Sequence, residues 1–323
     1  MKKDLAQVEQ EVLKARIKAE RAILKEIEDQ YERALTEINL HLARLLGRQD
    51  ANLPHVIHRV EYQRVLKQQV QAALDKLHSG EYESVMAYLN ESYTDAFVGT
   101  VYTLHHQDMP VILPIDQNLA VKAITLDTKL KKTLYEEMGV DINKLKRIIP
   151  KIITRGISSG MMYSEIARNI KNQAGIPMRR AKTIARTEAG RVQEQASYDA
   201  AQQAASKGAN LVKQWSAIRD GKTRDAHRAL HNQTRELDEP FEIDGQEAMY
   251  PHDFGDPALD CNCRCTMLTL AKASLDADTL KQMQEDAHTH GLMVEDSKEH
   301  GHAQAKNIAE FKKRYLKVTE RQR

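Results

Sequence analysis

The sequence is poor in aromatic residues and in cysteine. Aromatics make up only 5% of the 323 residues, whereas charged residues reach 29%. This balance is typical of long amphipathic helices and argues against a β-sandwich or a large α/β enzyme. All three cysteines lie within the motif CNCRC, so a secreted domain held by several disulfide bonds is excluded.

Several functional signatures are also missing. No run of about 18 apolar residues occurs, and the charged start MKKDLAQVEQ lacks the apolar stretch of a signal peptide. We therefore expect a protein that is made and used in the cytoplasm, without membrane contact. The motifs H-E-x-x-H, G-x-S-x-G, G-x-G-x-x-G and the P-loop are absent as well, which favours a protein that is not an enzyme.

Helical periodicity dominates the first two thirds of the chain. Apolar residues recur at helical spacing from Leu5 to Leu45, which predicts one long helix. The pattern continues over 56–78 and 81–106 with a break at Ser79-Gly80, so domain 1–108 is expected to be an amphipathic helical hairpin or bundle. An extended connector follows at Pro110 to Pro114.

Domain 109–207 is expected to be a basic helical region. Within it, residues 118–207 predict four helices, because glycine and proline interrupt the pattern three times. The expected breaks are Gly139-Val140, Gly156 to Gly160 and Gly175 to Pro177.

The residue composition and the hydrophobic pattern change after residue 207. Leu211 to Ile218 is rich in β-type residues, and Gly, Pro, Asp and Asn become frequent from Asp220 to Leu270. We expect a small α+β module at 208–272 that contains CNCRC, followed by a helical or partly flexible tail at 273–323. The predicted fold class is therefore mainly α, with long N-terminal helices, a helical middle region, this module and the tail.

The motifs TRDAHRALH and CNCRC could together form a metal site. A helix would place His227 and His231 one turn apart on one face, and an extended CNCRC would point its sulfurs to one side. Two sulfurs with one or two imidazoles could surround zinc. The candidate metal ligands are His227, Cys261, Cys263 and Cys265. The alternative is that reduced cysteines simply pack the module, with His227 hydrogen-bonded in a helix.

Positive charge is concentrated in one segment. Residues 122–191 hold 16 Lys and Arg against 6 Asp and Glu, and the rest of the chain holds 32 against 40. The segment is thus +10 and the remainder −8. It could contact phosphates of double-stranded DNA without base readout, or its charges could be ordinary solvated helix faces. The candidate DNA-binding residues are Lys131, Lys132, Lys144, Arg147, Lys151, Arg179, Arg180 and Arg186.

Three segments, in this order, resemble the Mu F-like domain of phage minor head proteins. They are RRAKTIARTEAGRVQEQASYDAA (179–201), QWSAIRDGKTRDAHRALHNQT (214–234) and NCRCTML (262–268). The residues that match the family motif are Arg186, Thr187, Glu188, Trp215, Asp220, Thr223, Arg224, His227, Asn262, Cys263, Arg264 and Cys265. Some relatives carry cysteines where Thr223 and His227 fall, so the resemblance implies His227, Cys263 and Cys265 as the remaining ligand set.

The resemblance also implies a role. It implies a head morphogenesis protein present in few copies inside the phage head, near the portal, that aids procapsid assembly and DNA packaging or exit. The implied partners are the portal protein, scaffold, major capsid protein and double-stranded DNA. The implied locations are the virion interior and, during assembly, the host cytoplasm.

Two other functions compete with this one. The first is a metal-dependent hydrolase or nuclease, with His227, His231 and Asp220 or Asp225 near a metal that has one position open to water. The second is a toxin delivered with the genome, since some relatives carry extra C-terminal domains. The 51 residues of the tail are too few for such a domain.

Overall fold

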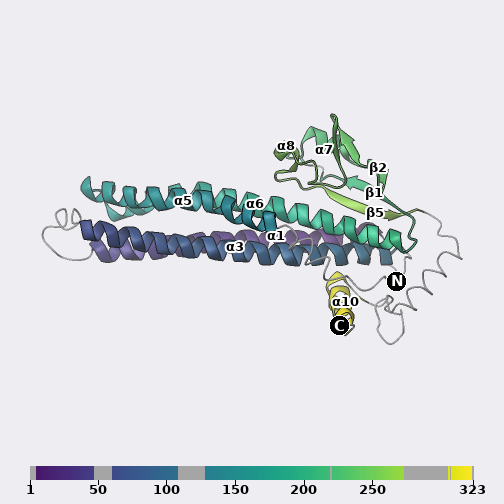
Figure 1. Cartoon of the computed structure of the whole chain (residues 1–323), viewed down its shortest axis with the longest axis horizontal. Coiled ribbons are helices and arrows are strands. Elements are labelled where there is room, and N and C mark those ends of the chain that lie inside the picture. Colours follow the sequence, from purple (N-terminus) through teal and green to yellow (C-terminus); the bar gives the residue numbers. More distant parts are fainter. Residues whose placement is uncertain are drawn as a thin grey trace. The chain divides into compact units, whose positions relative to one another are not determined.

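Four long helices form most of the protein, as Figure 1 shows. The computed structural model describes residues 5–46, 60–107, 128–218, 220–272, 305 and 307–321. The helices are α1 (Leu5–Leu46), α3 (Val60–His105), α5 (Thr128–Ser158) and α6 (Tyr163–Ser206). The predicted mainly α fold with a small sheet-containing module is confirmed. No helix in the described ranges is long and apolar enough to cross a membrane.

Helix α3 is continuous where the sequence predicts a break. Buried residues follow one another at three- or four-residue spacing through Leu77, Glu81 and Val85, so one side of the helix stays buried across Ser79-Gly80. The Gly80 carbonyl accepts a hydrogen bond from Gln30 Nε2 of α1 at 3.2 Å. Packing outweighs the roughly 1 kcal/mol that a mid-helix glycine costs.

The sequence predicts four helices over 118–207, but the described part of that range contains two, α5 and α6. Pro150 lies inside α5 and Pro177 inside α6, and Gly139 and Gly175 do not interrupt them either. The expected break at Gly156 to Gly160 does separate the two helices, and Gly160 has a positive φ of 66°. The Pro110 to Pro114 connector lies outside the described residues.

The chain divides into two compact units, to which α1, α3 and α6 each contribute residues. One unit comprises residues 21–87 and 127–185 and has an entirely helical core in its described part. Ile27, Ile38, Leu74, Ile142 and Ile153 are among its fully or almost fully buried residues. The other unit comprises residues 1–20, 88–126 and 186–323, and it contains the sheet. The four domains expected from the sequence, and the three boundaries between them, stay a prediction.

The sheet of the second unit has the strand order β2-β1-β5. Strand β1 (Leu211–Ser216) pairs antiparallel with β5 (Thr266–Ala271) over six residues and with β2 (Thr234–Glu236) over three. A separate hairpin joins β3 (Phe241–Ile243) and β4 (Gln246–Ala248). Its turn is Asp244-Gly245, both with positive φ, as a two-residue type I′ turn requires.

Side chains from the helices occupy the free edge of β5. Gln107 accepts a hydrogen bond from the Ala271 amide at 2.8 Å and donates to the Thr269 carbonyl at 2.9 Å. Glu194 of α6 accepts from the Met267 amide at 2.6 Å and is paired with Arg16 of α1 at 2.6 Å. These bonds fasten the sheet to the helices and block the edge against further strand pairing.

The core of the module is built around the single tryptophan. Trp215 of β1 is fully buried and packs edge-on against Phe241, with ring centroids 5.2 Å apart. Leu230, Cys263 and Cys265 complete the buried cluster together with Ala217. Lys213, on the same face of β1, is also fully buried and donates to the carbonyls of Leu237 and Met249.

A helix closes the C-terminal part of the chain. Helix α10 (Ile308–Arg321) buries Phe311 and Tyr315 completely, and Phe311 packs on Tyr102 of α3 at 5.0 Å between ring centroids. Lys312 forms ion pairs with Glu91 and Asp95. A helical part of the predicted tail is therefore present, while residues 273–304 lie outside the described ranges.

Candidate metal centre

Three buried side chains converge in the module. The ligand atoms of His227, Cys263 and Cys265 all lie within 4.8 Å of one another. His227 Nδ1 is 3.5 Å from Cys263 Sγ and 3.3 Å from Cys265 Sγ. With bonds of about 2.3 Å to sulfur and 2.0 Å to nitrogen, the sulfur–nitrogen edge of a zinc tetrahedron is about 3.6 Å. The group can therefore hold a metal ion with little rearrangement.

The two thiols are coupled. Cys263 donates to Cys265, which together with burial raises the pKa of Cys263 to about 11. The same hydrogen bond lowers the pKa of Cys265, because it stabilises that thiolate. A divalent cation bound between these two soft sulfur ligands would displace the thiol protons.

Short elements position the three ligands. His227 lies in α7 (Asp225–Leu230), and its ring meets that of Trp215 edge-on at 6.0 Å. Cys263 and Cys265 follow α8 (Pro257–Asp260), whose N-cap Asp256 accepts from the Ala258 amide. Asn262 has a positive φ of 53°, which turns the chain directly before Cys263.

This turn corrects the extended geometry expected for CNCRC. The motif precedes β5 and is not part of a strand, so Cys261 is not in the three-residue group and is only partly buried. His231 also lies outside the group of His227, Cys263 and Cys265. It caps the C-terminal end of α7 with a non-helical ψ of 129°, and its Nδ1 accepts from the Ala217 amide at 3.1 Å. His227 and His231 therefore do not form a ligand pair.

His252 is a buried histidine of the same module that the sequence analysis did not single out. It is only 4% exposed, and its Nδ1 is buried without a hydrogen-bond partner. Its ring packs against Gly190 of α6, one turn beyond Thr187, whose Oγ1 accepts from the Asn262 amide next to Cys263. A possible signal was its position in the irregular stretch PHDFGDP between the two halves of the site.

Salt bridges and backbone contacts hold the cysteine-bearing loop. Asp220 and Arg264 form a two-pronged ion pair with distances of 2.6 and 2.7 Å, and this pairing holds the pKa of Asp220 well below its usual range. Arg224 donates to the carbonyls of Leu259 and Cys261. The Asn262 amide donates to Thr187 Oγ1 of α6 at 3.1 Å.

The segment that contains this site matches a known family. Residues 147–268 match the family of phage Mu protein F like proteins. This part of the chain is a Mu F-like domain. The family resemblance drawn from the sequence is thus confirmed.

Two curated proteins are similar over a longer stretch. The minor head protein GP7 of Bacillus phage SPP1 is 32% identical over 201 residues, which cover 59% of this chain and 63% of GP7. The NAD(+)–arginine ADP-ribosyltransferase EFV of Enterococcus faecalis is 32% identical over 203 residues, or 61% of this chain and 41% of EFV. The chain thus spans less than two thirds of either relative. No solved structure matches.

The Mu F-like motif forms the internal framework of the domain. Besides the loop contacts of Asp220, Arg224 and Thr187, Thr223 Oγ1 donates to the Ile218 carbonyl, and Arg186 contacts Asn262 at 3.4 Å. Glu188 pairs with Arg191 one turn along α6. These contacts explain the widely separated motif residues as the parts of one packed unit.

The candidate DNA-binding residues fall into two groups. Arg186 is paired with Glu20 at 2.7 Å within the unit that holds the Mu F-like cysteines. The others lie in the helical unit, where Lys144 and Arg180 share Asp141 and Lys132 is 3.9 Å from Glu136. Arg147, Lys151 and Arg179 are exposed and have no carboxylate partner among the described residues, and the side chain of Lys131 is outside the described set.

The hydrolase alternative finds no support in the placement of its residues. It requires His231 and Asp220 or Asp225 near the metal. His231 is bonded to the Ala217 amide, Asp220 is paired with Arg264, and Asp225 is an exposed residue paired with Arg228. The expectation that the chain is not an enzyme stays a prediction. One of the two similar proteins, EFV, has the name of an enzyme, but this chain matches only 41% of its length.

Proposed function

We propose that the protein is a minor head protein of a tailed bacteriophage, located inside the head near the portal. The observation that carries this proposal is the Mu F-like match together with the similarity to a minor head protein over 59% of the chain. The proposed partners are the portal protein, with scaffold and major capsid protein during procapsid assembly. The proposed role is to aid assembly and the packaging or exit of DNA.

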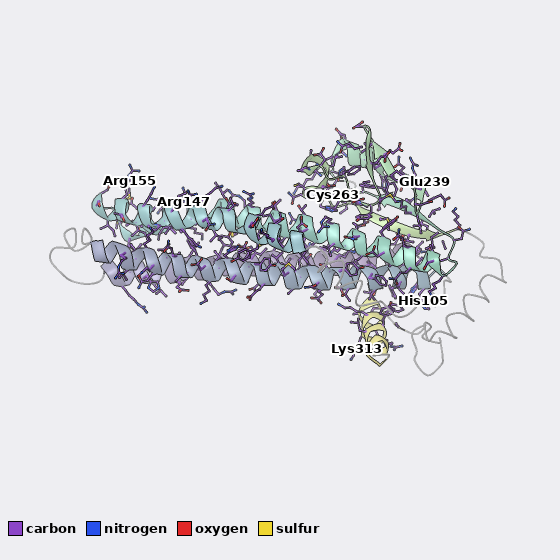
Figure 2. All side chains as sticks on the ribbon, viewed as in Figure 1. His105, Arg147, Arg155, Glu239, Cys263 and Lys313 are labelled. Atoms are coloured by element: carbon purple, nitrogen blue, oxygen red, sulfur yellow. The ribbon has the colours of Figure 1, made fainter. Side chains whose placement is uncertain are left out.

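The proposed contact with packaged DNA uses a stripe of cations on α5. Arg147, Lys151 and Arg155 follow one another at four-residue spacing, so they lie along one face over about 12 Å. Figure 2 shows Arg147 and Arg155 on this helix. All three are exposed, and none is paired with a carboxylate in the described part of the chain. Such a stripe can neutralise phosphates without reading sequence.

A gel-shift titration of duplex DNA against the purified full-length chain tests this contact. The triple variant Arg147→Gln/Lys151→Gln/Arg155→Gln should weaken binding at low salt and reduce the salt slope by about 2.7, because each phosphate contact contributes about 0.9. The matched control is Lys25→Gln/Arg33→Gln/Lys76→Gln, which removes three charges that already face carboxylates. Equal losses in both variants would refute a specific role for the stripe.

We also propose that the ion held by His227, Cys263 and Cys265 is zinc. Two thiols and an imidazole are ligands that zinc prefers, and the burial of all three suits a structural ion. When bound, zinc would join α7 to the cysteine loop and thereby stabilise the domain. The metal content of protein purified without chelator tests this proposal, and Cys261→Ser is the matched control for Cys263→Ser.

A further inference from the structure

Three protein ligands leave one corner of a zinc tetrahedron open, and the identity of the fourth ligand decides what the site can do. A water there would permit catalysis, whereas a fourth side chain makes the site purely structural. We infer that His252 is the fourth ligand, so that the centre is a closed Cys₂His₂ site. This inference rests on the zinc binding proposed above.

The surroundings of His252 support this assignment. A buried imidazole nitrogen without a hydrogen-bond partner is unfavourable, and His252 Nδ1 is such an atom. The ring packs against Gly190 of α6, one turn beyond Thr187, whose Oγ1 accepts from the Asn262 amide next to Cys263. His252 is not in the group whose ligand atoms all lie within 4.8 Å, so its ring must move toward the sulfurs when metal binds. That movement would give the unsatisfied imidazole a bond.

The other nearby candidates already have partners or lie elsewhere. His231 Nδ1 accepts from the Ala217 amide, and Thr223 Oγ1 donates to the Ile218 carbonyl. Cys261 is outside the three-residue group, and its carbonyl accepts from Arg224.

Charge also favours a neutral fourth ligand. Two thiolates balance the two positive charges of zinc, so a Cys₂His₂ site is neutral, whereas a zinc-bound hydroxide would leave one negative charge in the core. The buried Glu194 carboxylate accepts from the Met267 amide, two residues beyond Cys265, so a hydroxide here would add another negative charge to the same part of the core.

Helix α6 provides the space in which His252 sits. A Cβ added at Gly190 would collide with the Nε2 and Cε1 atoms of the His252 ring. Gly190→Ala therefore displaces the ring without removing a ligand, and alanine is about 1 kcal/mol more favourable than glycine within a helix. This variant tests the position of His252 independently of its chemistry.

X-ray absorption at the zinc edge of the purified full-length protein tests the assignment. We expect one zinc per chain, with two sulfurs at about 2.3 Å and two nitrogens at about 2.0 Å. His252→Ala should lose one nitrogen from the zinc shell and weaken zinc binding at least tenfold, and Gly190→Ala should weaken it in the same direction. His231→Ala, the matched histidine control, should keep four protein ligands.

The possible outcomes distinguish the role of His252 from the proposed zinc binding and from the minor head assignment. Zinc bound by two sulfurs, one nitrogen and a water in the unaltered protein would overturn the role of His252 and leave zinc binding intact. A protein without zinc would overturn both, whereas the minor head assignment has its own tests. Because His252→Ala could unfold the domain, Trp215 fluorescence should establish that each variant is folded, and the zinc shell of the unaltered protein decides the question by itself.

Discussion

Two buried ionisable residues, Lys213 and Glu81, differ in how the fold satisfies their polar groups. Lys213 is surrounded by acceptors, since its amine donates to two carbonyls and lies about 5.1 and 5.2 Å from the ring centroids of Tyr198 and Phe241. Burial still lowers its pKa to about 8. Glu81 lacks such compensation: it is fully buried, and neither carboxylate oxygen has a hydrogen-bond partner.

The pKa of Glu81 leads to a pH-dependent prediction. Burial, and then the negative charge of Asp141, raises this pKa from 4.5 to about 8. The folded protein therefore keeps a proton that the unfolded chain releases, so the free energy of unfolding falls as pH rises from about 4.5 to about 8. Glu81→Gln removes this loss and should stabilise the protein by on the order of 4 kcal/mol at pH 8 and little at pH 4.5.

Urea unfolding followed by circular dichroism at several pH values measures this effect. The control is Glu83→Gln, which changes an exposed carboxylate two residues away on the same helix and should not produce the trend. The groups around Glu81 are Tyr31 of α1 and Asp141 of α5, and Asp141 in turn binds Lys144 and Arg180. A Glu81→Gln gain that is equal at pH 4.5 and pH 8 would contradict the prediction.

At the scale of elements, the free edge of β5 relies on Gln107 for two of its backbone hydrogen bonds. This side chain satisfies one amide and one carbonyl at the strand's free edge. Gln107→Ala should lower the free energy of unfolding by about 1 to 2 kcal/mol, because two backbone groups lose their partner. It should also speed hydrogen exchange at the Ala271 amide.

The fluorescence of the single tryptophan can report the loss of stability caused by Gln107→Ala, because the tryptophan lies in the sheet itself. Trp215 lies on β1, the strand paired with β5, so its fluorescence follows unfolding of the sheet. Gln68→Ala, at an exposed position of helix α3, which ends two residues before Gln107, is the matched control. An unchanged rate of hydrogen exchange at the Ala271 amide in Gln107→Ala would show that this side chain does not protect the edge of β5.

For the whole molecule, uneven charge and the Mu F-like match lead to one prediction about where the protein is found. The +10 segment 122–191 suits a polyanion, and the Mu F-like domain indicates a phage head. Quantitative mass spectrometry of procapsids, full heads and emptied particles should find the protein at a low, portal-like copy number in the first two. The major capsid protein is the internal control, and absence from all three particles would refute the minor head assignment.

Sequence patterns predicted the helices better than their ends. The long apolar period from Leu5 identified α1 almost to the residue, whereas Gly80, Gly139 and Pro177 were given too much weight as helix breakers. Their local cost is a few kcal/mol at most, and continuous burial on one side of each helix exceeds it. Gly160 did end a helix, since the chain adopts a positive φ there.

The sequence by itself determined the mainly helical fold, the position of the sheet-containing module and the family, because periodicity, composition and motif order are local properties of the chain. Only the tertiary structure decided which side chains meet. It separated Cys261 and His231 from the metal group and placed His252 against α6, one turn from the threonine that binds the cysteine loop. These contacts depend on a turn at Asn262 and on loop packing against α6, and neither follows from residue spacing.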